Sequence, residues 1–128
     1  MAKWLTQEWL DESTELAKDQ PVRPGASARL QYRIVDGPDG DVSYYWIVVD
    51  GRLVENRLGE LADAEVTLTE SYEDAKAMQQ GLLDANTAFM QGKIKVTGDV
   101  AKLMSLLPIT MSPEFQAFQQ AVLAITEF

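Results

Sequence analysis

The chain has 128 residues, of which 46% are hydrophobic and 24% charged, and its formal net charge at pH 7 is −9. It contains neither cysteine nor histidine, which excludes disulfides, thiol nucleophiles, histidine-based triads and Cys/His metal sites. Because most catalytic devices need these residues, we expect no catalytic residue, metal or cofactor. The acidic balance also argues against nucleic acid as a partner.

The proportions are typical of a folded protein, and residues 1–128 are expected to form a single domain. No apolar run approaches the ~20 residues of a membrane-spanning helix. The first nine residues, MAKWLTQEW, include polar and acidic side chains where a signal peptide needs an uninterrupted apolar region. We therefore expect a cytoplasmic protein of bacterial type.

The first predicted element is a helix. Thr6 is a good N-cap for a segment ending near Lys18, in which Trp9 and Leu10 belong to one apolar stripe. Such a helix is expected to cover a sheet. Pro24, followed by glycine, indicates the loop that leaves it.

Four segments in the middle of the chain show the pattern of β-strands. Residues 30–34 alternate between apolar and polar, whereas residues 42–49 carry apolar side chains on both faces. A strand of the second kind is central, or one of its faces lines something other than water. Residues 52–58 are more polar and suit an edge strand, and residues 65–69 form a fourth strand with its two apolar side chains inward.

A tight hairpin is predicted between the second and third of these strands. Asp50-Gly51 is the sequence typical of a two-residue type I′ turn, which sets the register of the strands on either side. The expected pairs are Val48 with Leu53, Ile47 with Val54, and Trp46 with Glu55.

The next segments predict two short helices and a fifth strand. Ser71 begins the first helix, and Asp84 begins the second, which ends before Gly92. Gly92 lies where a helix C-terminus favours a residue with positive φ. Residues 94–96 alternate as a strand between two helices, and we expect this strand at or near a sheet edge.

Two further helices are predicted at the C-terminal end. Asp99 is expected to cap a helix that runs to Leu107 and is stopped by Pro108. Pro113 suits the first position of the last helix. That helix must bury its apolar stripe against the rest of the protein, another chain or a ligand. The stripe includes Phe115, Phe118 and Val122.

Charge and methionine are unevenly distributed. Residues 1–88 carry 8 basic and 17 acidic side chains, whereas residues 89–128 carry 3 of each and are neutral. Four of the five methionines lie between Met78 and Met111. Methionine adapts to irregular shapes, so this neutral, methionine-rich part favours a cavity wall over an ordinary core.

The chain resembles the sterol carrier protein type 2 family. The most specific match is AFMQGKIKVTG at residues 88–98, which fits the pattern AF-x-QGK-x-K-x-TG. Asp36-Gly37-Pro38 with Gly40, Trp46–Asp50 and Ala64–Thr69 agree in order and approximate spacing, so the resemblance covers Leu5 to Leu107. It implies an α/β (α+β) fold with a five-stranded mixed, mainly antiparallel sheet, helices covering it, and an enclosed apolar tunnel.

The resemblance also implies a lipid site without catalytic residues, holding fatty acid, fatty acyl-CoA, phospholipid or sterol. Three further residues are expected at the site from the amphipathicity of the last helix alone: Phe115, Phe118 and Val122. The wall residues that the resemblance implies are Trp46, Val48, Met78, Phe89, Met90, Val100, Leu103, Met104 and Leu107.

Three functions remain open on the sequence. The first is a non-catalytic carrier of apolar ligands, and the second is an accessory subunit that presents lipid to, or docks on, a lipid-metabolising enzyme. The third is an enzyme that uses carboxylates or lysine. Well-known members of the sterol carrier protein type 2 family are basic. This chain has a net charge of −9, which opposes contact with anionic membranes. An enzyme partner is therefore a plausible recipient of the lipid, and stable membrane insertion is not expected.

Overall fold

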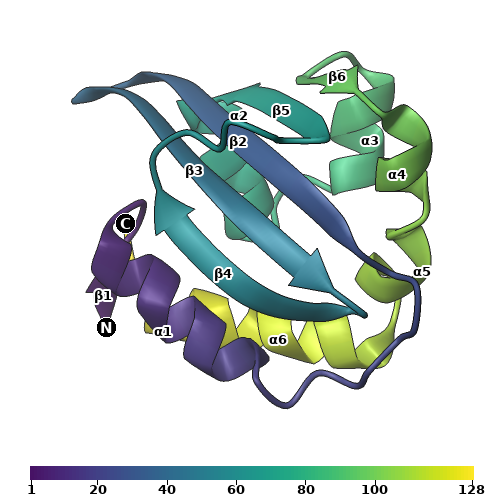
Figure 1. Ribbon diagram of the computed structural model, residues 1–128. Coiled ribbons are helices and arrows are strands. Elements are labelled where there is room, and N and C mark those ends of the chain that lie inside the picture. The colour runs from purple at the N-terminus through teal and green to yellow at the C-terminus, as the bar shows by residue number, and fades with distance from the viewer.

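A five-stranded sheet lies at the centre of the computed structural model, which describes residues 1–128 (Figure 1). Its strands are β2 (Ala28–Gly37), β3 (Gly40–Val49), β4 (Arg52–Leu58), β5 (Val66–Ser71) and β6 (Ile94–Gly98). They lie in the order β4-β3-β2-β5-β6, with β2 and β5 parallel and every other neighbouring pair antiparallel. The expected mixed, mainly antiparallel sheet is confirmed, as are the edge positions of β4 and β6.

Six helices accompany the sheet, and side-chain caps begin five of them, four of which were predicted. The side chains of Thr6, Ser71, Asp84, Asp99 and Ser112 each accept a hydrogen bond from the backbone N–H three residues further on. These bonds satisfy donors that the first helical turn leaves free. The helices are α1 (Gln7–Ala17), α2 (Tyr72–Gln79), α3 (Ala85–Met90), α4 (Val100–Met104), α5 (Leu107–Thr110) and α6 (Pro113–Ile125).

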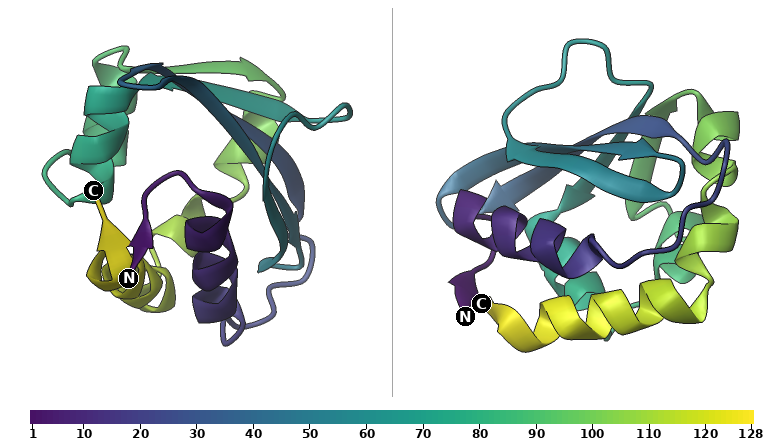
Figure 2. Two further views of the ribbon diagram at one scale, coloured as in Figure 1. Left: turned by 90° about the vertical axis from the view of Figure 1, so that its left-hand side faces the viewer. Right: turned by 60° about the horizontal axis from the view of Figure 1, so that its bottom comes forward.

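The apolar core lies between the sheet and the helices and is divided into two clusters. One cluster packs Leu10 of α1 and Phe118 of α6 against Ile34 of β2. The other packs Ile109 of α5 against Val66 of β5. Figure 2 shows the sheet curving around one side of the molecule while α1 and α6 lie on the other. Three partly buried aromatic residues contact both clusters: Tyr32, Trp46 and Phe115.

The two ends of the chain pair with each other, which the sequence analysis did not anticipate. β1 (Ala2–Lys3) and β7 (Thr126–Glu127) form a parallel two-stranded sheet, and the termini lie side by side (Figure 2). The buried Trp9 Nε1 donates to Thr126 Oγ1 over 2.8 Å. This bond ties α1 to the end of α6, so the last helix is held against the first.

The register of the β3–β4 hairpin differs from the expectation beyond its first pair. Positive φ at both Asp50 and Gly51 agrees with the predicted turn type, and Val48 pairs with Leu53 as expected. A β-bulge then shifts the strand, so the remaining predicted pairs are wrong. Ile47 pairs with Glu55, and Trp46 pairs with Asn56.

The bulge changes which side chains of β4 point inward. Val54, the additional residue, is 56% exposed. Asn56 is buried, and its Nδ2 donates to the carbonyl oxygen of Leu10 in α1 over 3.1 Å. A long-range hydrogen bond between helix and strand therefore accompanies the shifted register, and a period-two extrapolation from the turn could not predict it.

The predicted helix from Val100 to Leu107 is also corrected. It is divided into α4 and α5, and Pro108 lies in the first turn of α5 instead of following the helix end. A proline lacks the N–H that the first turn leaves unpaired, so it fits a helix start without losing a hydrogen bond. The two short helices can therefore take different directions over the cavity described below.

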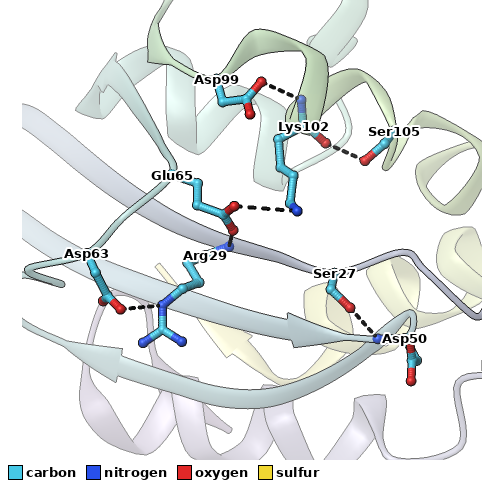
Figure 3. Close-up of polar contacts among 8 residues, drawn as sticks. All are labelled: Ser27, Arg29, Asp50, Asp63, Glu65, Asp99, Lys102 and Ser105. Carbon is cyan, nitrogen blue, oxygen red and sulfur yellow. Dashed lines mark hydrogen bonds and ion pairs between the residues drawn. The ribbon is translucent and has the colours of Figure 1, made fainter.

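A polar network holds α4 against the sheet (Figure 3). Glu65 lies just before β5 and accepts a hydrogen bond from the backbone N–H of Arg29 over 2.9 Å. Its other carboxylate oxygen lies 3.4 Å from Nζ of Lys102 in α4. Asp99 caps the same helix by accepting from the Lys102 N–H over 3.0 Å. These contacts fix the position of a helix that carries two residues of the cavity wall.

Candidate functional site: a central apolar cavity

A cavity of about 1170 Å³ lies between the sheet and the helices. Side chains from all five strands of the large sheet and from all six helices contribute to its wall. Of the 41 lining residues, 28 are hydrophobic, so the interior is suited to an apolar molecule. A second hollow, of about 430 Å³ between α1 and β4, has one hydrophobic residue among eight and lacks this character.

The alternation of side chains along the strands builds the sheet side of the wall. Because successive residues point to opposite faces, Leu30 and Tyr32 of β2 face the same space as Tyr44 and Trp46 of β3. The rings of Tyr32 and Tyr44 are stacked with centroids 4.9 Å apart, and the Trp46 ring lies 5.3 Å from that of Tyr32. These three aromatic residues form a cluster on the sheet side of the wall.

The cavity reaches the surface at α3, α4 and α5, which follow one another along one side of the molecule (Figure 1). Several large apolar residues line the cavity and are nevertheless accessible to water. Leu82 is 79% exposed and Met111 66% exposed, and three more residues of the wall are exposed to a lesser degree. These three are Phe89, Met104 and Leu107.

The wall carries few ionisable groups. Burial and, to a smaller extent, the nearby Asp74 carboxylate raise the pKa of Glu70 to about 7. Burial also raises the pKa values of the Tyr32 and Tyr44 hydroxyls, so both stay protonated at neutral pH. No lysine or arginine lines the cavity.

Four polar atoms of wall residues are buried without a hydrogen-bond partner in the chain: the indole Nε1 of Trp4 and of Trp46, Oε1 of Gln20 and Oδ1 of Asn56. Buried polar atoms usually have a partner, and these four have none within the chain. Nowhere does the structure bring three His, Cys, Asp or Glu side chains close enough to hold a metal ion. The cavity therefore offers apolar contact and a few hydrogen-bonding atoms.

The structure places ten of the twelve predicted site residues on this cavity. It does not place Met90 or Val100 there: Met90 is 85% exposed in the last turn of α3, and Val100 is 41% exposed in the first turn of α4. Short helices turn such terminal residues outward, which an apolar pattern alone does not reveal. The ten lining residues are Trp46, Val48, Met78, Phe89, Leu103, Met104, Leu107, Phe115, Phe118 and Val122.

The sequence analysis missed the polar residues of the wall, among which Glu70 is the most informative. The predicted strand ended at residue 69, whereas β5 continues to Ser71. Val66, Leu68 and Glu70 therefore share the inward face of one strand. Extending the alternation by one residue would have placed a carboxyl group inside the protein.

The fold and the cavity together define an α+β structure in which an apolar cavity lies between a curved mixed sheet and its helices. Residues 7–110 match the model of the SCP-2 sterol transfer family, and the chain belongs to that family. The expected family membership is thus confirmed. The matched residues include every strand of the large sheet and the helices α1 to α5, and α5 ends at Thr110.

Individual proteins agree with this assignment. The chain is 33% identical over 87 residues to "Sterol carrier protein 2" of Gallus gallus, covering 64% of this chain but only 15% of that relative. The structure also resembles a crystal structure of sterol carrier protein 2, with a TM-score of 0.71, 14% identity and coverage of 97% of this chain and 99% of that one. A solution structure of palmitated SCP2L2 from Aedes aegypti has a TM-score of 0.63 and 19% identity, covering 84% and 92% of the two chains. At these identities the two structures establish the fold alone.

No helix of the protein combines the length and the apolar character needed to span a membrane.

Proposed function

We propose that the protein binds an apolar lipid in the central cavity and carries it without chemical change. The observation that supports this most directly is the cavity itself, about 1170 Å³ in volume and lined mainly by hydrophobic side chains. Burial of each methylene group gives about 0.8 kcal/mol, so a chain of about 16 carbons gains enough for micromolar or tighter binding after the costs of association. The family description, sterol transfer, and the palmitated structural neighbour support the same class of ligand.

The absence of catalysis is part of the proposal. The wall contains no nucleophile beside a base, and its tyrosines are kept protonated by burial. Glu70 is a lone carboxyl without an ion-pair partner among the six ion pairs of the structure. Such an interior is suited to solvating a lipid, and any reaction of the lipid is assigned to other proteins.

A second candidate function is an accessory role for the same cavity. The chain spans about 15% of the length of the curated relatives that it matches, so in those proteins the matching part belongs to a much longer chain. The net charge of −9 also disfavours direct exchange with anionic membranes. Under this alternative the protein presents its lipid to, or docks on, a lipid-metabolising enzyme.

The test compares two variants of one helix. Leu103 lines the cavity and Val100, three residues earlier in α4, does not, so Leu103→Arg and Val100→Arg add the same charge on and off the wall. Delipidated protein is titrated with the neutral fluorescent probe N-phenyl-1-naphthylamine, and thermal melts are recorded for each variant. We expect Leu103→Arg to weaken binding at least tenfold with a folded protein, since a long side chain can extend toward the cavity mouth, and Val100→Arg to bind as the wild type.

Native mass spectrometry of freshly purified protein separates the two candidate functions. A co-purifying lipid supports the carrier function, and a co-purifying partner chain supports the accessory one. A folded wild-type protein that carries no lipid from expression and does not bind the probe at micromolar concentration would contradict the carrier function and the presentation of lipid to an enzyme.

A further inference from the structure

The cavity wall has an unusual charge composition. The chain contains 11 lysines and arginines, and none of them lines the cavity. The wall instead carries two carboxyl groups, those of Glu70 and Asp84. Two lysines on cavity-lining helices are engaged elsewhere: Lys76 lies 5.9 Å from the centre of the Phe128 ring, and Lys102 pairs with Glu65. A negatively charged group inside the cavity would therefore meet no cation.

Glu70 is held on the inner face by the sheet. Its neighbours across the strands are Ile34 of β2 and Ile94 of β6, two apolar residues that cannot neutralise a carboxylate. The titratable group that acts on it is the Asp74 carboxylate of α2, and Glu70 in turn raises the pKa values of the Tyr32 and Tyr44 hydroxyls. None of these is positively charged, so an anion near Glu70 is repelled or requires Glu70 to take up a proton.

The hydrogen-bonding atoms of the wall favour a different polar group. Glu70 and Oδ1 of Asn56 can accept hydrogen bonds, whereas the Trp46 indole and the hydroxyls of Tyr32 and Tyr44 can donate them. A hydroxyl group both donates and accepts, so it can satisfy groups of either kind without bringing a charge into the apolar space. A carboxylate or phosphate only accepts at neutral pH.

The mouth of the cavity does not provide the missing cation. Its polar lining consists of amide side chains, the Thr110 hydroxyl and the Asp84 carboxylate, which already caps α3 by accepting from the Thr87 N–H. A fatty acid whose carboxylate lies at this opening keeps the carboxylate hydrated but forms no ion pair. The remaining polar residues of this side are Gln79, Asn86, Gln116, Gln119 and Gln120.

We propose that the central cavity selects lipids whose polar end is an uncharged hydroxyl group, as in a sterol or a long-chain alcohol, and discriminates against lipids with a carboxylate or phosphate. The selection rests on the proposed lipid-carrier function and specifies the class of ligand. Glu70 is its main determinant, because it lies in the wall without a basic partner. The palmitated neighbour is a different protein of 19% identity, so its ligand does not decide the preference of this one.

The experiment compares two ligands that share one chain length. Dodecan-1-ol and dodecanoate each displace N-phenyl-1-naphthylamine from delipidated protein at pH 8, below their solubility limits. We expect the alcohol to bind at least about tenfold more tightly than the acid in the wild type. Part of this ratio of the two dissociation constants arises because any apolar cavity penalises the loss of water around a carboxylate. The decisive quantity is therefore the change of the ratio in Glu70→Gln. This variant should bind dodecanoate more tightly and reduce the ratio at least about fivefold.

A matched control removes a charge elsewhere. Asp39 is exposed in the β2–β3 turn, away from the cavity, so Asp39→Asn changes the net charge equally and should keep the wild-type ratio. Dodecane-1-sulfonate, whose charge does not vary with pH, gives a test without a variant. Its binding to the wild type should tighten between pH 8 and pH 5.5, as Glu70 becomes protonated.

The possible failures are distinct. If the wild type binds the acid as tightly as the alcohol, or if Glu70→Gln leaves the ratio unchanged, the proposed selection is wrong while the carrier function stands. Sulfonate binding that does not change with pH also contradicts the selection, even if Glu70→Gln fails to fold. If neither the probe nor the alcohol binds, the proposed carrier function is wrong.

Discussion

Replacing Glu70 with glutamine should stabilise the protein at neutral and alkaline pH and change little in acid. The pKa of Glu70 rises from 4.5 to about 7 on folding, chiefly because burial penalises the charged carboxylate. The folded protein therefore binds this proton more tightly than the unfolded chain. Its stability falls as the pH rises from about 4.5, and the whole contribution is lost above about pH 7.

The magnitude follows from the size of the pKa change. Each tenfold change in proton affinity corresponds to about 1.4 kcal/mol, so the free energy of unfolding should decrease by at most about 3 kcal/mol across this pH range. Glutamine has nearly the same shape and carries no charge, so Glu70→Gln does not incur this loss. We expect the variant to exceed the wild type by about 2–3 kcal/mol at pH 8 and to match it at pH 4.5.

The measurement is urea unfolding of delipidated wild type, Glu70→Gln and Asp39→Asn at half-unit steps from pH 4.5 to pH 8.5. Asp39→Asn controls for net charge, because Asp39 is exposed in the hairpin turn. The difference between Glu70→Gln and the wild type should grow with pH, and the difference for Asp39→Asn should not. If Glu70→Gln shows the same pH dependence as the wild type, Glu70 is ionised in the folded protein and the argument from burial is wrong.

Two further predictions concern the glycines with positive φ and the hydrogen bond between Trp9 and Thr126. Gly92 and Gly98 both have positive φ, but an added Cβ meets no atom within 4 Å at Gly92 and lies 2.4 Å from the Glu65 carbonyl oxygen at Gly98. Gly92→Ala should therefore cost about 1 kcal/mol in urea unfolding and Gly98→Ala at least about 3 kcal/mol, and equal costs would contradict the close approach. Thr126→Val removes the buried acceptor of the Trp9 indole and should cost about 1–3 kcal/mol in the same assay, whereas a neutral result would mean that water replaces the hydroxyl.

Features that depend on a few neighbouring residues could be predicted from the sequence. The caps at Thr6 and Asp99, the turn at Asp50-Gly51 and the positive φ of Gly92 all satisfy backbone groups within about four residues. Strand alternation likewise identified the buried positions Leu30, Val66 and Leu68. Family membership could be predicted from the motif at residues 88–98, because the other matching segments agree with the family in order and approximate spacing.

Features that depend on distant contacts required the tertiary structure. The bulge at Val54 accompanies an inward Asn56 that bonds to α1, and the β1–β7 pair joins the two ends of the chain. Helices of five or six residues present one or two faces according to how they pack, so the apolar character of Met90 and Val100 did not place them on the cavity wall.

The sequence by itself therefore determined most of the helices and strands, because hydrogen-bond patterns and side-chain alternation are local, and its resemblance to the family implied the five-stranded sheet. The tertiary structure decided the volume of the cavity, its opening and the polar atoms of its wall. Glu70 illustrates the reason: its sequence marks it as an ordinary acidic residue near a strand end, and only the packing of β2, β6 and the helices around it limits its contact with water and raises its pKa.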